Sequence, residues 1–337
     1  MSRNSTIANP PIDQPLPRLR LGTRGSPLAL AQAHELADRL ARAHGFAKEA
    51  VAITIIRTSG DMIQDRPLSL AGGKGLFTKE LDQALIEGMV DLAVHSAKDL
   101  PTILPEDLII AGYLPREDVR DVWISPKAGH PRDLPPGSVV GTASLRRGAL
   151  LKRLRPDLEV RLLRGNVETR LAKLAAGEVD ATLLALAGLR RLGLADKATQ
   201  VLAIEDFLPA AGQGAIGITT RRDDAATLAL LAPILDPATH VALAAERGFL
   251  TVLDGSCKTP IGAHATVEHD QVTLRGIVLR PDGSEWFEAC ESGPLESGSL
   301  EAARELGETA ARAILARLPE GFFQESAQEN AQKNAKE

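Results

Sequence analysis

The sequence predicts an α/β protein in which two similar lobes flank a cleft, followed by a small C-terminal α+β domain. Two observations predict the lobes: a strand–turn–helix pattern that occurs twice, and a second pair of matching segments in the same order. A third observation, a run of hairpin signals near the C-terminus, predicts a three-stranded antiparallel sheet. Strands that alternate with helices are typical of α/β units.

The first lobe begins with a short apolar strand, Leu19 to Leu21, followed by a Gly-Thr turn and an amphipathic helix with Pro27 in its first turn. Far downstream, Val139–Val140 precedes a second Gly-Thr turn and a helix on the same plan. IEGMVDLAVHSAKDL likewise parallels AAGEVDATLLALAGL, since each ends a helix at Gly and passes through Val-Asp into a buried strand. We therefore expect lobe 1 at residues 18–114 with 215–233, and lobe 2 at residues 115–214.

The last third of the chain has a different pattern. Helical periodicity runs through ATLALLAPIL and HVALAAERGFLTVL, and three short strands follow, IGAHATVE, QVTLRGIVLR and SEWFEACE. An amphipathic helix from Leu300 to Leu318 closes this domain, which we place at residues 236–320. Residues 1–17 and 321–337 are Pro-rich or polar, and we expect them to be flexible tails.

Composition disfavours several classes of function. The longest apolar runs fall far short of the ~20 residues that span a bilayer, and the N-terminus lacks the apolar core of a signal peptide. Two cysteines without an export signal argue against a disulfide scaffold, so we expect a cytoplasmic protein that does not bind membranes. The net charge of −5 and the 3% of aromatic residues disfavour nucleic acid as a partner.

One segment has a charge opposite to that of the whole chain. Between Gly141 and Lys173, nine basic residues accompany only three acidic ones, a net charge of +6. Such a run is often a solvated helix face, but arginine predominates here, and guanidinium groups bind carboxylate or phosphate oxygens two at a time. We therefore expect a small polyanionic ligand. The basic residues are Arg146, Arg147, Lys152, Arg153, Arg155, Arg161, Arg164, Arg170 and Lys173, and the acidic ones are Asp157, Glu159 and Glu168.

Candidate ligand-binding groups lie where α/β units usually hold ligands, at the carboxyl ends of strands and at helix N-termini. Because both predicted lobes carry such groups, we expect them to line one cleft. In lobe 1 these groups are Arg24, Ser26, Lys98 and Asp99, and in lobe 2 they are Thr142, Ser144, Arg146 and Arg147.

Two other motifs do not indicate a nucleotide or metal site. GGKG is not a phosphate-binding loop, because Lys74 is followed by Gly75 rather than Ser or Thr. It is either a hinge of a mobile lid or a plain loop. The seven histidines lack the spacing of metal ligands, so no metal is expected.

The two cysteines differ in their surroundings. Cys290 alternates with Trp286 and Glu288 in a strand, which favours a buried structural thiol. Cys257 lies on a turn among small residues, and the neighbouring Lys258 favours the thiolate. Cys257 is therefore a candidate nucleophile, with an inert loop thiol as the alternative.

Eight segments in series resemble the porphobilinogen deaminase (hydroxymethylbilane synthase) family, over residues Arg18 to Leu318. No one of them is decisive, but the set in this order is highly specific. They are RLGTRGSPLALAQA, GGKGLFTKEL, DLAVHSAKDLP, GTASLRR, LRGNVETRL, LALAGLRRLGL, LPAAGQGAIGI and GSCKTPIG.

The resemblance implies two periplasmic-binding-protein-like lobes, a cytoplasmic monomer and a role for each motif. Cys257 corresponds to the cysteine that carries a dipyrromethane cofactor through a thioether, and Asp99 to the catalytic aspartate. Residues 60–75 resemble a mobile lid, in which Leu70 replaces a lysine found in many members, so that Lys74 alone would serve there. Groups that bind cofactor or substrate correspond to Arg24, Ser26, Phe77, Lys98, Thr142, Ser144, Arg146, Arg147, Arg164, Arg170, Arg191 and Gln213.

The implied reaction is a transferase step of haem biosynthesis in which four porphobilinogen molecules condense with loss of ammonia, and water then releases hydroxymethylbilane. Each porphobilinogen ring brings two carboxylates, which would account for the arginines. Asp99 would stabilise the cationic azafulvene left after ammonia departs. Cys257 would tether the growing chain between additions. The alternative is a non-catalytic two-lobed anion- or solute-binding protein, but a solute receptor should carry an export signal, and neither it nor a regulator needs the C-terminal domain.

Overall fold

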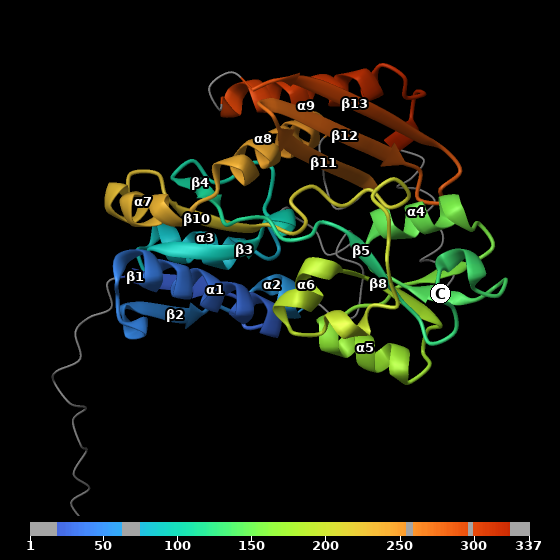
Figure 1. The fold of residues 1–337 in the computed structure, drawn as a ribbon, viewed down its shortest axis with the longest axis horizontal. Coiled ribbons are helices and arrows are strands. Elements are labelled where there is room, and N and C mark those ends of the chain that lie inside the picture. Colours follow the sequence, from blue (N-terminus) through green and yellow to red (C-terminus); the bar gives the residue numbers. More distant parts are fainter. Residues whose placement is uncertain (1–18, 63–74, 254–258, 296–298, 324–337) are drawn as a thin grey trace, which may run out of the picture.

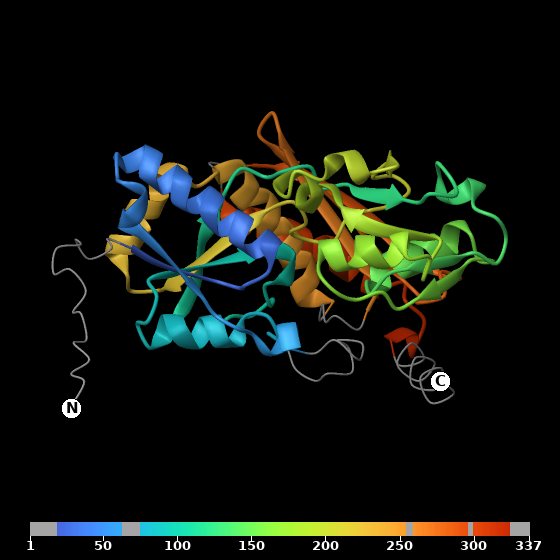
Figure 2. The same ribbon diagram turned by 90° about the horizontal axis from the view of Figure 1, so that it is seen from below.

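The computed structural model describes residues 19–62, 75–253, 259–295 and 299–323 (Figure 1). In these ranges the chain forms two five-stranded sheets and one three-stranded sheet. The two larger sheets belong to lobes that lie side by side in both views, and the third belongs to the C-terminal domain (Figures 1 and 2). Cys257, Leu70 and Lys74 lie outside the described residues.

The sheet of lobe 1 has the strand order β2-β1-β3-β10-β4. β1 pairs in parallel with β2 and β3, whereas β10, which returns from lobe 2, pairs antiparallel with β3 and β4. The elements are β1 (Leu19–Thr23), α1 (Pro27–His44), β2 (Val51–Ile55), α2 (Ser59–Met62), α3 (Lys79–Ile86), β3 (Leu92–Ser96), β4 (Leu108–Tyr113), β10 (Ile216–Arg221) and α7 (Ala225–Leu231).

The sheet of lobe 2 repeats this plan in the order β7-β6-β8-β5-β9. β6 pairs in parallel with β7 and β8, and β5, which arrives from lobe 1, pairs antiparallel with β8 and β9. Thus β6 and β8 match β1 and β3, which confirms the paired lobes; the boundaries assigned to them stay a prediction. The elements are β5 (Asp121–Ile124), β6 (Val139–Gly141), α4 (Leu145–Leu154), β7 (Glu159–Arg161), α5 (Val167–Ala175), β8 (Ala181–Ala185), α6 (Leu186–Arg191) and β9 (Gln200–Val201).

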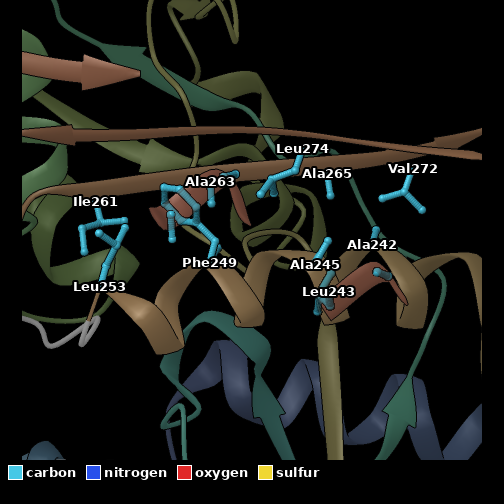
Figure 3. Close-up of a cluster of buried hydrophobic side chains, with 14 of the residues drawn as sticks. Ala242, Leu243, Ala245, Phe249, Leu253, Ile261, Ala263, Ala265, Val272 and Leu274 are labelled. Carbon is cyan, nitrogen blue, oxygen red and sulfur yellow. The ribbon is translucent and has the colours of Figure 1, made fainter. Parts of the chain in front are cut away.

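The C-terminal domain packs two helices on one face of an antiparallel sheet (Figure 3). Phe249 of α8 lies in its core with Leu274 and Val278 of β12. Gly307 lets α8 and α9 approach closely, because a Cβ there would lie 1.9 Å from the carbonyl oxygen of Ala245. The elements are α8 (Pro237–Val252), β11 (Ile261–Glu268), β12 (Gln271–Leu279), β13 (Trp286–Pro294) and α9 (Leu300–Leu315).

Two expectations about this domain need correction. Cys290 is exposed rather than buried, because the alternation of β13 turns Phe287 and Ala289 toward the helices and places Cys290 on the opposite face. The closing helix ends at Leu315 rather than Leu318. In lobe 1, α3 begins at Lys79, after a turn at residues 75–78.

Within the described ranges, no single helix is long and apolar enough to cross a membrane. One sharply bent pair of helices, Ala225–Ile234 with Pro237–Val252, meets the criteria of length and composition together.

Asp82 is a buried acid on α3 that no pattern in the sequence singles out. Its side chain is 7% exposed and lines a cavity of about 360 Å³ between α3 and residues 101–105, and its Oδ1 has no hydrogen-bond partner. Burial raises the pKa of Asp82 to about 6; the Thr78 hydroxyl lowers it in part, and the charge of Glu80 raises it further.

We expect Asp82→Asn to stabilise the protein at neutral and alkaline pH. The folded-state pKa, about 6, exceeds the ordinary value of 3.8, so the wild type loses stability as pH rises between these values and keeps that penalty above them. The amide carries no such penalty. Urea unfolding should give the variant a larger free energy of unfolding at pH 8, by on the order of 2 kcal/mol, and a difference that shrinks toward zero near pH 4. A difference that did not change with pH would contradict this account.

Candidate active site

The first part of the site is a 3-10 turn, Ala97–Asp99, that directly follows β3 and carries Lys98 and Asp99. The segment returning from lobe 2 passes against it. Gly212 has a φ of 76°, and a Cβ there would lie 2.8 Å from the backbone nitrogen of Lys98, so this position requires glycine. The AGQG motif of the sequence therefore allows lobe 2 to approach the proposed catalytic turn.

Arg24 gathers three groups of lobe 1. It lies between β1 and α1, and its guanidinium pairs with Asp61 of α2. Its Nη1 is 3.9 Å from Oδ2 of Asp99, whose side chain is one-third exposed, and its Cζ lies 4.1 Å from the centre of the Phe77 ring. Arg24, Phe77 and Asp99, which the family resemblance implied as binding or catalytic residues, thus lie next to one another.

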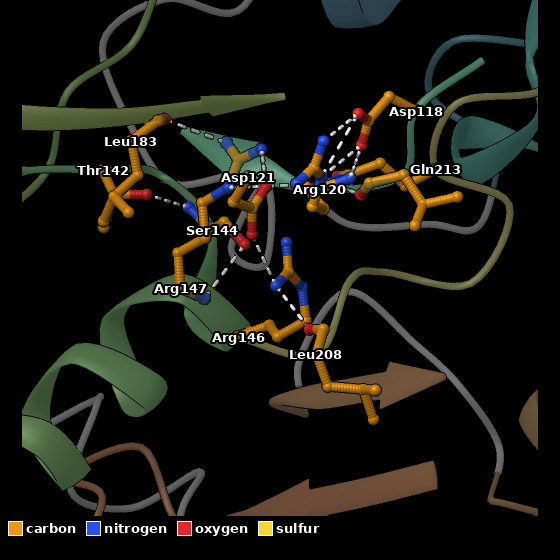
Figure 4. Close-up of polar contacts among 11 residues, drawn as sticks. Asp118, Arg120, Asp121, Thr142, Ser144, Arg146, Arg147, Leu183, Leu208 and Gln213 are labelled. Carbon is orange, nitrogen blue, oxygen red and sulfur yellow. Dashed lines mark hydrogen bonds and ion pairs between the residues drawn. The ribbon is translucent and has the colours of Figure 1, made fainter. Parts of the chain in front are cut away.

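Asp121 is the buried centre of the lobe 2 part of the site (Figure 4). Its carboxylate accepts hydrogen bonds from Nη1 of Arg146 at 2.8 Å, from Nη2 of Arg147 at 2.8 Å and from Nε2 of Gln213 at 2.8 Å. Burial alone would raise the pKa of Asp121, but the two guanidinium groups outweigh it and hold the pKa well below its usual range. Arg146 and Arg147 are only 4% and 5% exposed, so Asp121 is their internal counter-ion.

The positive charge of the site exceeds what these carboxylates neutralise. Nε of Arg146 is buried without a hydrogen-bond partner. Burial, with the charges of Arg147 and Arg164, lowers the pKa of Arg170 to about 10. Lys98 is an exposed residue; desolvation of its ammonium by the neighbouring protein groups, with the charge of Arg147, lowers its pKa to about 8. These groups fit an anionic ligand whose carboxylates would supply the missing charge.

Several of the side chains expected to bind a ligand accept hydrogen bonds from backbone nitrogens in this structure. Ser26 and Ser144 cap the N-termini of α1 and α4, accepting hydrogen bonds from the backbone nitrogens of Ala29 and Arg147. The Thr142 hydroxyl accepts a hydrogen bond from the backbone nitrogen of Ser144 at 3.1 Å. These side chains shape the N-termini of α1 and α4.

Two of the expected arginines lie at other edges of the site. Arg170 donates from Nε to the Gly165 carbonyl at 2.9 Å. Arg191 does not join the Asp121 cluster; it pairs with Glu35 of lobe 1 at the contact between α1 and α6.

The sequence analysis missed the carboxylates that hold the arginines. Asp121 opens the apolar run DVWI, and a charged residue at the head of a buried strand, next to an unexplained excess of arginine, was the available signal. Asp61 had no comparable signal. Glu246 was also missed: this fully buried residue on the apolar helix α8 accepts hydrogen bonds from Nη1 of Arg116 at 2.6 Å and from the backbone nitrogen of Gly212 at 2.6 Å.

Comparison with known proteins gives two family models and close relatives. The model described as porphobilinogen deaminase, dipyrromethane cofactor binding domain, matches residues 19–229, and the model described as porphobilinogen deaminase, C-terminal domain, matches residues 241–316. A porphobilinogen deaminase of Nitrobacter winogradskyi is 59% identical over 303 residues, which cover 90% of this chain and 94% of that protein. One of Nitrobacter hamburgensis is 58% identical over the same shares.

Solved structures show a weaker likeness. A putative methionine-binding lipoprotein of Bacillus subtilis has a TM-score of 0.40 and 15% identity, and covers 64% of this chain and 89% of its own. A periplasmic substrate-binding protein of an ABC transporter from Coxiella burnetii has a TM-score of 0.41 and 16% identity, and covers 66% of this chain and 93% of its own.

We expect Asp121→Asn to destabilise the protein strongly, because it leaves two guanidinium groups buried without their counter-ion. The loss in the free energy of unfolding should be about 3 kcal/mol, measured by urea unfolding. Asp157→Asn is the matched control, since Asp157 is 40% exposed where it pairs with Arg155, and should cost far less. Equal losses in the two variants would contradict the role given to Asp121.

Proposed function

The chain belongs to the porphobilinogen deaminase family, and from this premise we propose which of its residues bind and join porphobilinogen on a dipyrromethane cofactor. The family match makes the chain an enzyme of tetrapyrrole biosynthesis and disfavours the alternative of a non-catalytic binding protein. The observation that carries the residue assignments is the gathering of Arg24, Lys98, Arg146 and Arg170, with their positive charge, around one partly exposed carboxylate, Asp99.

Binding of the acidic pyrroles rests on the arginines of both lobes. Each pyrrole ring carries two carboxylates, and guanidinium groups bind carboxylates with paired hydrogen bonds. Arg146 and Arg170 are suited to the cofactor or the first rings, because one has an unpaired buried Nε and the other a lowered pKa that a carboxylate would reverse. We assign the same role to Arg24, Lys98, Arg147, Arg164 and Arg191, with Ser26, Lys74, Phe77, Thr142, Ser144 and Gln213 as further contacts.

Asp99 is the proposed catalytic residue. In porphobilinogen the bond from the methylene carbon to the amine breaks, ammonia takes the electron pair and a proton, and the remaining cation needs a nearby negative charge. The Asp99 carboxylate, beside the Arg24 guanidinium, supplies that charge and accepts hydrogen bonds from pyrrole N–H groups. The Arg24 guanidinium, whose Nη1 lies 3.9 Å from Oδ2 of Asp99, orients that carboxylate.

The cofactor would be held by Cys257, which lies outside the described residues, on the segment between α8 and β11. When bound, dipyrromethane supplies the nucleophilic pyrrole carbon to which the first substrate ring is joined. A thioether does not hydrolyse under the conditions that release the tetrapyrrole, so the chain stays attached between additions. We further propose that the protein acts as a cytoplasmic monomer without membrane or nucleic-acid partners. The net charge of −5 and the few aromatic residues support the absence of a nucleic-acid partner.

The attachment site is tested by the intact mass of the purified protein beside its Cys257→Ser variant. We expect the wild type to exceed its sequence mass by two linked pyrroles and the variant to show the bare mass, because serine forms no thioether. Cys290→Ser is the matched control and should retain the added mass. An excess that persisted in Cys257→Ser would place the attachment elsewhere.

The role of Asp99 is tested by Asp99→Asn, which keeps the size and removes the charge. We expect turnover of porphobilinogen to fall by about 10²-fold or more, as when an enzyme loses a group that stabilises charge in the transition state. The exposed Asp107 of the same lobe gives the control, Asp107→Asn, whose turnover should match the wild type. Near-normal turnover of Asp99→Asn would exclude Asp99 as the catalytic carboxylate.

A further inference from the structure

Arg191 differs from the other proposed ligand-binding arginines because it lies where the two lobes touch. It is the last residue of α6 in lobe 2, and its side chain is 10% exposed. Its Nε donates a hydrogen bond to Oε2 of Glu35, on α1 of lobe 1, at 3.1 Å. In the same contact Leu28 of α1 lies against Gly188 of α6, where a Cβ would be 3.5 Å from the leucine Cδ2. The pair thus crosses the boundary between the lobes.

Glu35 is itself fixed in place. Its second oxygen, Oε1, accepts hydrogen bonds from Nε and Nη2 of Arg39, one turn further along α1, at 3.3 and 3.2 Å. The carboxylate therefore bridges two guanidinium groups, one from each lobe. A carboxylate held in this way has fewer orientations to lose when it binds Arg191, which strengthens its hold on the second partner.

The second partner of Arg191 is a rigid backbone group. Nη2 donates to the carbonyl oxygen of Gly214 at 3.1 Å. Gly214 has a φ of 89°, a Cβ there would lie 2.3 Å from the Glu117 carbonyl oxygen, and its own carbonyl also accepts from the backbone nitrogen of Glu117 at 3.2 Å. This oxygen lies on the segment that returns to β10, so its position is set by the crossover between the lobes.

These two contacts use two of the five N–H groups of the guanidinium and leave one edge available. Nη1 has no partner among the described residues, and Nη2 retains a second hydrogen. The Nη1 and Nη2 edge is one that binds a carboxylate with two parallel hydrogen bonds. Because the guanidinium is fixed on its Nε side, its Nη1 and Nη2 edge is already oriented for a carboxylate ligand.

We propose that Glu35 is a positioning residue for Arg191: it fixes the Nε side of the guanidinium against lobe 1 and so presents the opposite edge to a carboxylate of the pyrrole chain. This inference rests on the proposed function, in which Arg191 binds such a carboxylate. Glu35 does not touch the ligand. Its contribution is to reduce the freedom that Arg191 loses on binding and to keep α6 against α1.

The test is a double-mutant cycle read as KM and kcat for porphobilinogen. Glu35→Ala should raise KM about fivefold, the upper range for a partly exposed ion pair, and leave kcat within about twofold. Glu35→Gln should raise KM less, because its amide oxygen still accepts from Nε. In an Arg191→Ala background Glu35→Ala should change KM no further. Glu49→Ala, an exposed glutamate of lobe 1, is the control and should match the wild type.

A second readout needs neither cofactor nor turnover. In the unloaded Cys257→Ser protein, modification of Arg191 by phenylglyoxal, followed by peptide mass spectrometry, reports how firmly the guanidinium is held. Adding Glu35→Ala should speed this modification severalfold, and adding Glu49→Ala should leave it unchanged.

Three outcomes would overturn the proposal. They are an unchanged KM in Glu35→Ala, effects of Glu35→Ala and Arg191→Ala on KM that simply multiply, and a KM that falls, which would make Glu35 a competitor of the substrate. A wild type that consumed no porphobilinogen would instead contradict the proposed function, while the modification assay would still decide whether Glu35 holds Arg191.

Discussion

The proposed active site depends on pairing buried or partly buried guanidinium groups with buried or partly buried carboxylates. Asp121 holds Arg146 and Arg147, Asp61 holds Arg24, and Glu35 holds Arg191. A buried ion pair brings little net stability, because both charges lose their hydration. Each ion pair here instead fixes the orientation of a guanidinium group away from bulk water, before an acidic ligand binds. Arg170 and Lys98 have no such carboxylate partner among the described residues, and desolvation, followed by the charge of Arg147, lowers the pKa of each.

The same device joins the three parts of the fold. Glu246 of α8 accepts hydrogen bonds from Arg116 on the outgoing crossover, from the backbone of Gly212 on the returning crossover and from the backbone of Ala265 in β11. A single carboxylate of the C-terminal domain thus fixes both connections between the lobes, next to the turn that carries Asp99. The domain that carries the proposed attachment cysteine is thereby held against the catalytic turn.

Local patterns were enough to predict the paired lobes and the three-stranded sheet, because strand–turn–helix repeats and hairpin turns are properties of short stretches. The concentration of arginine could be seen in the same way, from the net charge of +6 between Gly141 and Lys173. The face of β13 that Cys290 occupies was predicted wrongly, since alternation gives the period of a strand but not which face meets the core. The sequence could not show which carboxylate each arginine binds. Asp121 and Arg146 are 25 residues apart, and Glu35 and Arg191 are 156 apart, so only the packing of the lobes pairs them.

The most direct test of this account is the pKa of Lys98, measured from the pH dependence of its labelling by an amine reagent in the cofactor-loaded protein and in unloaded Cys257→Ser. If desolvation and the charge of Arg147 act on the Lys98 ammonium in the empty site, its pKa should be about 8 without the cofactor and clearly higher with it, because the pyrrole carboxylates add negative charge beside the ammonium. An ordinary pKa near 10.5 in the unloaded protein, or the same pKa in both forms, would contradict the claim that the cleft is built to receive carboxylates.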